Sequence, residues 1–115
     1  MGRVRETEQE NRVTAFYCKL HPPRPSFIAD MTPDERTIMA SHAEYWKRWM
    51  ADGHVVAFGV VGDPAGVYGV GLVQFEDEMA VREFTANDPT ILSNRGFRWE
   101  VLPMPFGVVY PQSSL

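Results

Sequence analysis

A long amphipathic segment with its own start and stop signals constrains the fold of this chain more than any other feature. From Thr32 to Gly53, apolar side chains recur at spacings of three and four residues, which is typical of a helix with one buried face. Thr32 is suited to cap this helix, Pro33 to occupy its first turn, and Glu35 to complete a capping box. Gly53 accepts the left-handed conformation that is common after a helix end. We therefore expect one helix over residues 32–53.

One polar residue, His42, interrupts the apolar stripe of this helix. The stripe consists of Ile38, Met39, Tyr45, Trp46, Trp49 and Met50. An imidazole within such a stripe faces the core or a cavity beside it, where its nitrogens need hydrogen-bond partners. Imidazole is also the side chain best suited to exchange a proton near neutral pH. His42 is therefore the first candidate for chemistry.

The other periodic segments predict four strands and a second helix. Strands are expected over residues 12–20, 54–61, 66–75 and 97–102, which are rich in β-branched and aromatic side chains. A shorter helix is expected over residues 77–86, with Met79, Ala80, Val81 and Phe84 facing inward. It ends at Asn87-Asp88-Pro89, because the residue before a proline avoids the helical conformation. Three prolines in 21–30 indicate a loop rather than a helix, and 90–95 is expected to be a short loop or single turn.

The order strand, helix, strand, strand, helix, strand predicts an α+β fold of the ferredoxin-like, split βαβ (βαββαβ) type. This fold has a four-stranded antiparallel sheet with two helices on one face. Residues 12–110 are expected to form the domain, 1–11 a frayed or disordered N-terminus, and 111–115 a C-terminal tail. Both faces of the central strands are largely apolar, so the second face is expected to be covered as well. We therefore predict a homodimer through the sheet faces, a dimeric α+β barrel.

Composition and charge argue against several classes of protein. A net charge of -4 without a basic run disfavours nucleic-acid binding, and no apolar stretch approaches the roughly 18 to 20 residues that span a bilayer. The single cysteine excludes an intramolecular disulfide and fits a reducing, cytoplasmic compartment. Cys18 and His21 have a C-x-x-H spacing but lack two further ligands, so no metal is expected. No dinucleotide fingerprint is present, and no cofactor is expected.

Asp88 is the second candidate for chemistry, because both helices of the predicted fold pack on the same sheet face. A carboxylate that accepts a hydrogen bond from one imidazole nitrogen fixes the tautomer and makes the other nitrogen a better base. A small ligand would then lie between the helices and the sheet, walled by Tyr17, Trp46 and Tyr68. Arg95 is a further candidate for holding an anionic ligand. The alternative is that His42 is a core histidine with satisfied nitrogens and that Asp88 only forms a turn.

Several motifs, in their joint order, resemble the YciI-like (YCII-related) family of small proteins with a dimeric ferredoxin-like fold. The matching pieces are Pro-Pro-Arg-Pro, Asp-Met-Thr-Pro-Asp-Glu-Arg, Ser-His-Ala-Glu-Tyr-Trp, Ala-Asp-Gly, Phe-Gly-Val-Val-Gly-Asp-Pro-Ala-Gly, Asn-Asp-Pro and Glu-Val-Leu-Pro. The resemblance covers about residues 12 to 110. The loop over residues 21–31 is longer than in the shortest members of the family.

The resemblance implies that His42 and Asp88 are an active-site pair. Most members of the family lack an assigned reaction, and suggested activities involve small organic molecules, including elimination on hydroxylated rings. We therefore expect a cofactor-independent enzyme of lyase or isomerase type. His42 would act as general acid or base on a small polar aromatic or keto-enol compound, oriented by Asp88. The alternatives are a non-catalytic metabolite-binding or regulatory module and an accessory domain of a larger system.

Overall fold

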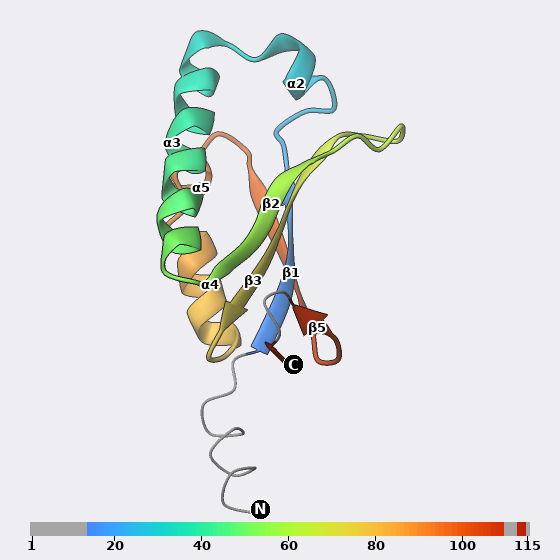
Figure 1. Ribbon diagram of the computed structural model, residues 1–115. Helices are drawn as coiled ribbons and strands as arrows, with labels where there is room; N and C mark the ends of the chain where they lie inside the picture. The colour runs from blue at the N-terminus through green and yellow to red at the C-terminus, as the bar shows by residue number, and fades with distance from the viewer. Residues whose placement is uncertain (1–13, 110–112, 115) are drawn as a thin grey trace, which may run out of the picture.

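The computed structural model describes residues 14–109 and 113–114, and its main sheet contains the four expected strands. These are β1 (Thr14–His21), β2 (Val55–Val61), β3 (Tyr68–Phe75) and β4 (Arg98–Met104). They pair antiparallel in the order β2-β3-β1-β4, and helices α3 (Pro33–Ala51) and α4 (Glu78–Ala86) lie on one face of this sheet (Figure 1). The α+β, ferredoxin-like architecture is thereby confirmed. The expected frayed segment 1–11 and residues 111, 112 and 115 of the tail lie outside the described residues.

Local chemistry explains where α3 begins and ends. The hydroxyl of Thr32 accepts a hydrogen bond from the backbone N–H of Glu35 at 3.1 Å, and the carboxylate of Glu35 accepts one from the N–H of Thr32 at 2.9 Å. The predicted capping box is therefore present, with Pro33 as the first helical residue. The helix ends at Ala51, and Gly53 follows with a φ of +92°, which glycine adopts without steric cost.

The strand register divides the side chains of β1 between two environments. Phe16 and Cys18 face the helices and are buried, whereas Tyr17 lies between Leu72 and Leu102 on the opposite face. The core under the helices consists of Phe16, Cys18, Trp46, Val55, Val73, Phe75, Val81, Phe84 and Val101. This is the packing that fixes α3 and α4 relative to the sheet.

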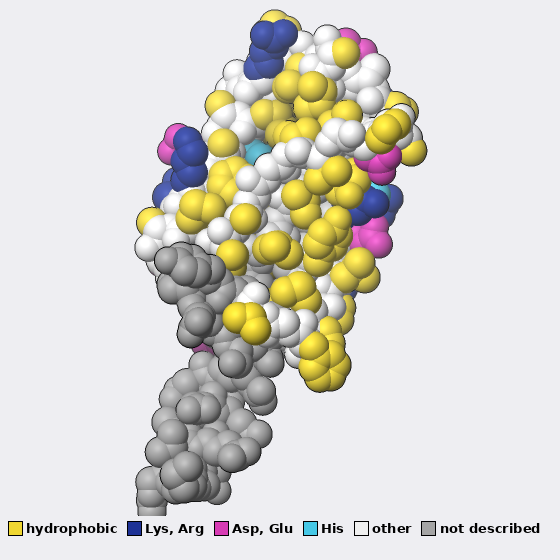
Figure 2. Space-filling view, turned by 45° about the vertical axis from the view of Figure 1, so that its right-hand side comes forward, with side chains coloured by type: hydrophobic (Ala, Val, Ile, Leu, Met, Phe, Trp, Pro, Cys, Tyr) yellow, Lys and Arg dark blue, Asp and Glu magenta, His cyan; other side chains and the backbone are white. Residues whose placement is uncertain are grey.

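The face of the sheet away from the helices is also apolar, as the sequence predicted. Tyr17, Val70 and Leu72 are only half-buried there, and Leu102 is 46% exposed. In a view turned toward this side, Figure 2 shows hydrophobic side chains gathered on the surface, with charged side chains mainly toward the edges.

A short helix, α2 (Phe27–Asp30), lies where a loop was expected. Pro22, Pro23 and Pro25 all precede its first residue, so none of them interrupts a helical hydrogen bond. Its anchor is Phe27, which is buried and meets the ring of Phe97 edge-on at 5.2 Å between centroids.

Two further expectations about element boundaries and faces were wrong. Met79 is 78% exposed because it lies in the first turn of α4, while Val81 and Phe84 supply the buried face of that helix. The last strand of the sheet continues to Met104, beyond the predicted end at 102. Pro103 is tolerated because β4 is an edge strand. The region beyond it contains a small second sheet of β5 (Val108–Val109) and β6 (Ser113–Ser114).

Candidate functional site

The carboxylate of Asp88 is the centre of a buried hydrogen-bond network. Asp88 caps the short helix α5 (Pro89–Leu92), and its Oδ1 accepts from the backbone N–H and the hydroxyl of Thr90, both at 2.8 Å. Its Oδ2 accepts from Nε1 of Trp46 at 2.5 Å and from Nδ1 of His42 at 2.8 Å. Asp88 has no exposed surface. A buried charge of this kind persists in folded proteins only when it is paired and hydrogen-bonded, as it is here.

These contacts set the protonation preference of Asp88. Burial would raise the pKa of this carboxyl group. The hydrogen bonds from His42, Thr90 and Trp46, together with the charge of His42, outweigh burial and hold the pKa below its ordinary value. Asp88 is therefore an ionised acceptor at neutral pH.

The structure brings His42 and Asp88 together and assigns different roles to the two imidazole nitrogens. Because an ionised carboxylate only accepts hydrogen bonds, Nδ1 of His42 carries the proton. In the neutral ring, Nε2 is then the basic nitrogen. No atom of the described residues hydrogen-bonds to Nε2, and the His42 side chain retains 12% of its surface. Within the described part of the chain, His42 is thus oriented through Nδ1 alone.

Trp46 contacts both the carboxylate of Asp88 and the backbone of strand β3. Its indole N–H donates to Asp88, and its ring lies against the backbone of Gly71. The absence of a side chain at Gly71 allows this close approach, since a Cβ at that position would lie 2.3 Å from Cζ3 of Trp46. Trp46, which was predicted to wall a ligand, thus lies behind Asp88 and is not among the residues that line the larger cavity beside His42.

Thr90 is the member of this network that sequence reasoning missed. The signal was the segment Asp88-Pro89-Thr90, because an aspartate before a proline is a common helix cap whose side chain accepts from the second or third helical N–H. The Asp-Pro step follows the end of α4, which was predicted, and also caps α5, which was not.

A cavity of about 210 Å³ opens beside His42, between α2, α3 and the β2–β3 hairpin. It is lined by Leu20, Pro22, Phe27, Ile28, Met39, His42, Ala43, Phe58, Gly59, Val60, Val67, Tyr68, Gly69 and Phe97. Apart from His42 and Tyr68, every residue in this set is apolar or glycine. No Lys, Arg, Asp or Glu from the described part of the chain lines the cavity.

Tyr68 is the one predicted substrate-binding residue that lines this cavity. Tyr17 lies on the sheet face away from the helices, where its hydroxyl is 3.4 Å from that of Tyr68, so it does not wall the cavity. Arg95 is exposed and faces Asp34 at 3.4 Å, away from the cavity lining.

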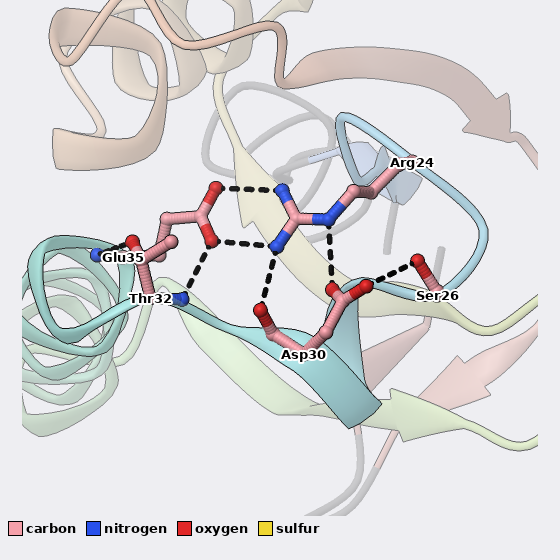
Figure 3. Close-up of polar contacts among 5 residues, drawn as sticks. All are labelled: Arg24, Ser26, Asp30, Thr32 and Glu35. Carbon is pink, nitrogen blue, oxygen red and sulfur yellow. Dashed lines mark hydrogen bonds and ion pairs between the residues drawn. The ribbon is translucent and has the colours of Figure 1, made fainter.

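The wall formed by α2 is held in place by ionic contacts around Arg24, here called the Arg24 clasp (Figure 3). The guanidinium of Arg24 donates two hydrogen bonds to the carboxylate of Glu35, at 2.7 and 2.8 Å, and its Nε donates to Asp30 at 2.8 Å. The two hydrogen bonds from Arg24 to Glu35, together with the bond from the backbone N–H of Thr32, lower the pKa of Glu35 to about 2. The clasp therefore ties the C-terminal end of α2, at Asp30, to the first turn of α3.

A second polar atom near His42 also lacks a partner. Nε1 of Trp99 is buried and, within the described part of the chain, makes no hydrogen bond. The Trp99 ring stacks on Trp46 at 5.2 Å and lies 6.3 Å from the His42 ring, between centroids. A hollow of about 10 Å³ is lined by all three side chains, and space of this size holds about one water molecule.

No group of three His, Cys, Asp or Glu side chains in residues 14–109 and 113–114 is arranged to hold a metal ion. The C-x-x-H pair is divided between the two sheet faces: Cys18 is in the core, and His21 bonds to Glu100 at 3.0 Å. Burial raises the pKa of the Cys18 thiol to about 12, which disfavours the thiolate that metal binding requires.

Comparison with protein-family models identifies a match over residues 15–105, to the YCII-related domain. The chain belongs to the YCII-related family. The matched range contains the main sheet except for Thr14, both long helices and the His42–Asp88 pair. A search of curated proteins found no match to this YCII-related chain. Among its described residues, none of the helices is both long and apolar enough to cross a membrane.

Proposed function

We propose that this YCII-related protein is a small-molecule enzyme of lyase or isomerase type, in which His42 transfers a proton and Asp88 orients it. The observation that carries this proposal is the asymmetry of the His42 ring. Nδ1 is 2.8 Å from a buried carboxylate, whereas Nε2 has no partner among the described residues and the ring lines a cavity. A structural histidine would be expected to have both nitrogens satisfied.

The geometry supports proton transfer in both directions. In the resting state, the hydrogen bond to Asp88 keeps the proton of the His42 ring on Nδ1. Nε2 is therefore free of a proton and accepts one from a bound compound. The resulting imidazolium is stabilised by the adjacent carboxylate, which remains fixed by Thr90 and Trp46. Reverse transfer from Nε2 to a neighbouring carbon or leaving group completes an isomerisation or an elimination.

The residues that line the cavity narrow the class of compound that we propose. The sequence predicted a polar aromatic or keto-enol molecule, and the lining favours one that carries no charge. Since no Lys, Arg, Asp or Glu of the described residues lines the cavity, the compound is neutral and largely apolar, with one polar group facing His42. A cavity of about 150 Å³ holds a benzene ring. The 210 Å³ beside His42 therefore suits one substituted ring or a compact bicycle.

Proton abstraction can be tested with cyclohexanone, a neutral ring whose hydrogens next to the carbonyl exchange slowly in heavy water. The parent protein is expected to accelerate this exchange, followed by NMR, beyond the rate given by free imidazole at the same concentration and pH. The His42→Ala variant should return the rate to the imidazole level, and Asp88→Asn should reduce it substantially. A parent rate no greater than that of imidazole would contradict catalysis by His42.

A non-catalytic, metabolite-binding or regulatory module, or an accessory domain, is the second candidate. It is favoured by the composition of the cavity lining, in which Tyr68 is the only ionisable residue of the described chain besides His42, and the hydroxyl of Tyr68 lies 3.4 Å from that of Tyr17 on the other face of the sheet. Such a module would bind the same neutral compounds without accelerating exchange. Binding of cyclohexanone with no acceleration would select this alternative.

We also propose that the apolar face of the sheet pairs with a second copy of the chain. The support is the half-buried surface of Tyr17, Val70 and Leu72 and the exposed side chain of Leu102, because a free sheet face normally carries polar residues. Sedimentation should give a dimer at micromolar concentration, and Leu102→Glu should shift it toward monomer. A monomeric parent would contradict pairing.

A further inference from the structure

The position of Ile28 is not explained by core packing. This side chain is 46% exposed, although it belongs to α2 and follows the fully anchored Phe27. Ile28 instead lines the cavity, together with Phe27. An apolar residue held at the rim of a cavity contacts whatever enters that cavity.

A helix of four residues has no stability of its own, so other contacts must fix α2. On one side Phe27 packs against Phe97. On the other side the Arg24 clasp joins Asp30, at the end of α2, to Glu35 in α3 (Figure 3). The fork of the guanidinium bonds to both carboxylates at once, which lysine cannot reproduce. Loss of the clasp would release the Asp30 end of α2 while Phe27 stayed anchored, so Ile28, which lies between these two residues, would lose one of its two supports.

We infer that α2 is the specificity wall of the cavity: Ile28 sets the size of the compound that is accepted, and Arg24 is the positioning residue that holds the wall. This inference rests on the proposed function, because it concerns the cavity beside His42. It adds a determinant of selectivity that is separate from the proton-transfer pair.

Phenol and naphthol are suitable probes, because both are neutral and differ by one ring. Dissociation constants are measured for both compounds with the parent and with Ile28→Ala. Truncation of Ile28 should raise the affinity for naphthol relative to phenol by about tenfold, as expected for a hydrophobic pocket enlarged by a few carbon atoms. The matched control is Met79→Ala, which removes an exposed apolar side chain of α4 outside the cavity lining and should leave the ratio unchanged.

The clasp is tested with Arg24→Lys, which keeps the charge and loses the fork. Its ratio of naphthol to phenol affinity should move toward that of Ile28→Ala, and the amides of residues 27–30 should exchange faster with solvent. The control is Arg36→Lys, which makes the same substitution at an exposed arginine in the first turns of α3, the helix that contains Glu35. A purely structural role for Arg24 would lower stability without changing the affinity ratio.

The outcomes separate this inference from the proposed function. An affinity ratio that is the same in the parent, Ile28→Ala and Arg24→Lys would overturn the specificity wall, whatever happens in the exchange assay with cyclohexanone. A shifted ratio supports the wall even if the parent fails to accelerate exchange, which would overturn catalysis alone. A parent that binds neither phenol nor naphthol would overturn the wall, because the cavity would then not be a site for neutral rings.

Discussion

The indole of Trp46 lies between Gly71 and Asp88, with its ring against the backbone of the first and its N–H on the carboxylate of the second. Trp46 has no exposed surface and is the largest fully buried side chain in the core of the described residues. One residue of helix α3 therefore couples the packing of the helix on strand β3 to the orientation of the carboxylate that holds His42.

Substitution of Gly71 by alanine is expected to disturb this coupling. The new Cβ would lie 2.3 Å from Cζ3 of Trp46, so the ring must move away from the sheet. Overpacking of this kind typically costs about 1–3 kcal/mol of unfolding free energy. Urea denaturation followed by tryptophan fluorescence measures the loss. Gly59→Ala is the matched control, because a Cβ added there meets no described atom within 4 Å, and an equal loss there would contradict the explanation.

The Asp88→Asn variant tests whether the network depends on a carboxylate. An asparagine has one acceptor oxygen, so its amide group must face a donor, either the N–H of Trp46 or that of Thr90. Removing one partner of a buried ionic network costs on the order of 3 kcal/mol. Thermal and urea unfolding should both show the loss, and NMR should show that the proton on Nδ1 of His42 is no longer fixed. A variant as stable as the parent would indicate that Asp88 is not a buried acceptor in solution.

The sequence predicted those features that depend on local chemistry or on topology. The capping box at Thr32 and Glu35 depends only on residues three positions apart. The approach of His42 to Asp88 follows once both helices are assigned to the same face of the sheet, because this fold places them side by side. Neither inference needed the identity of the neighbouring side chains.

The features that sequence analysis missed depend on packing between distant segments. Trp46 was expected to wall a ligand, but its orientation is determined by Gly71 on β3, which no periodicity of α3 reveals. Arg95 was expected near a ligand, yet it faces Asp34 across the surface. The helix α2 is anchored because Phe27 packs against Phe97, and these two residues are 70 positions apart in the chain.

Cys18 is expected to be inert in the folded protein. It is fully buried, and burial raises the pKa of its thiol to about 12, so the reactive thiolate is scarce at neutral or mildly alkaline pH. Its labelling by iodoacetamide should therefore be slow in buffer and fast in urea. Because this is the only cysteine of the chain, the labelling rate also reports opening of the core. Rapid labelling in buffer, at the rate of a free thiol, would contradict the burial of β1 under the helices.

The Arg24 clasp should make the stability of the protein depend on acid pH. The hydrogen bonds from Arg24 and Thr32 lower the pKa of Glu35 from 4.5 to about 2, so the folded state binds this proton less readily than the unfolded state. The stabilisation is complete above about pH 4.5 and is lost as the pH falls toward 2. The Glu35→Gln variant lacks this carboxylate, and its deficit in unfolding free energy relative to the parent should shrink over the same interval.

Urea titrations of the parent and of Glu35→Gln across this pH range measure that deficit. The same comparison in an Arg24→Gln background provides the control, because the larger part of the shift should disappear when the guanidinium is absent. The bond from the backbone of Thr32 remains in that background and should preserve a smaller pH dependence. A deficit that stays constant between pH 4.5 and 2 would show that Glu35 is not held as an ion pair, and α2 would then need another anchor besides Phe27.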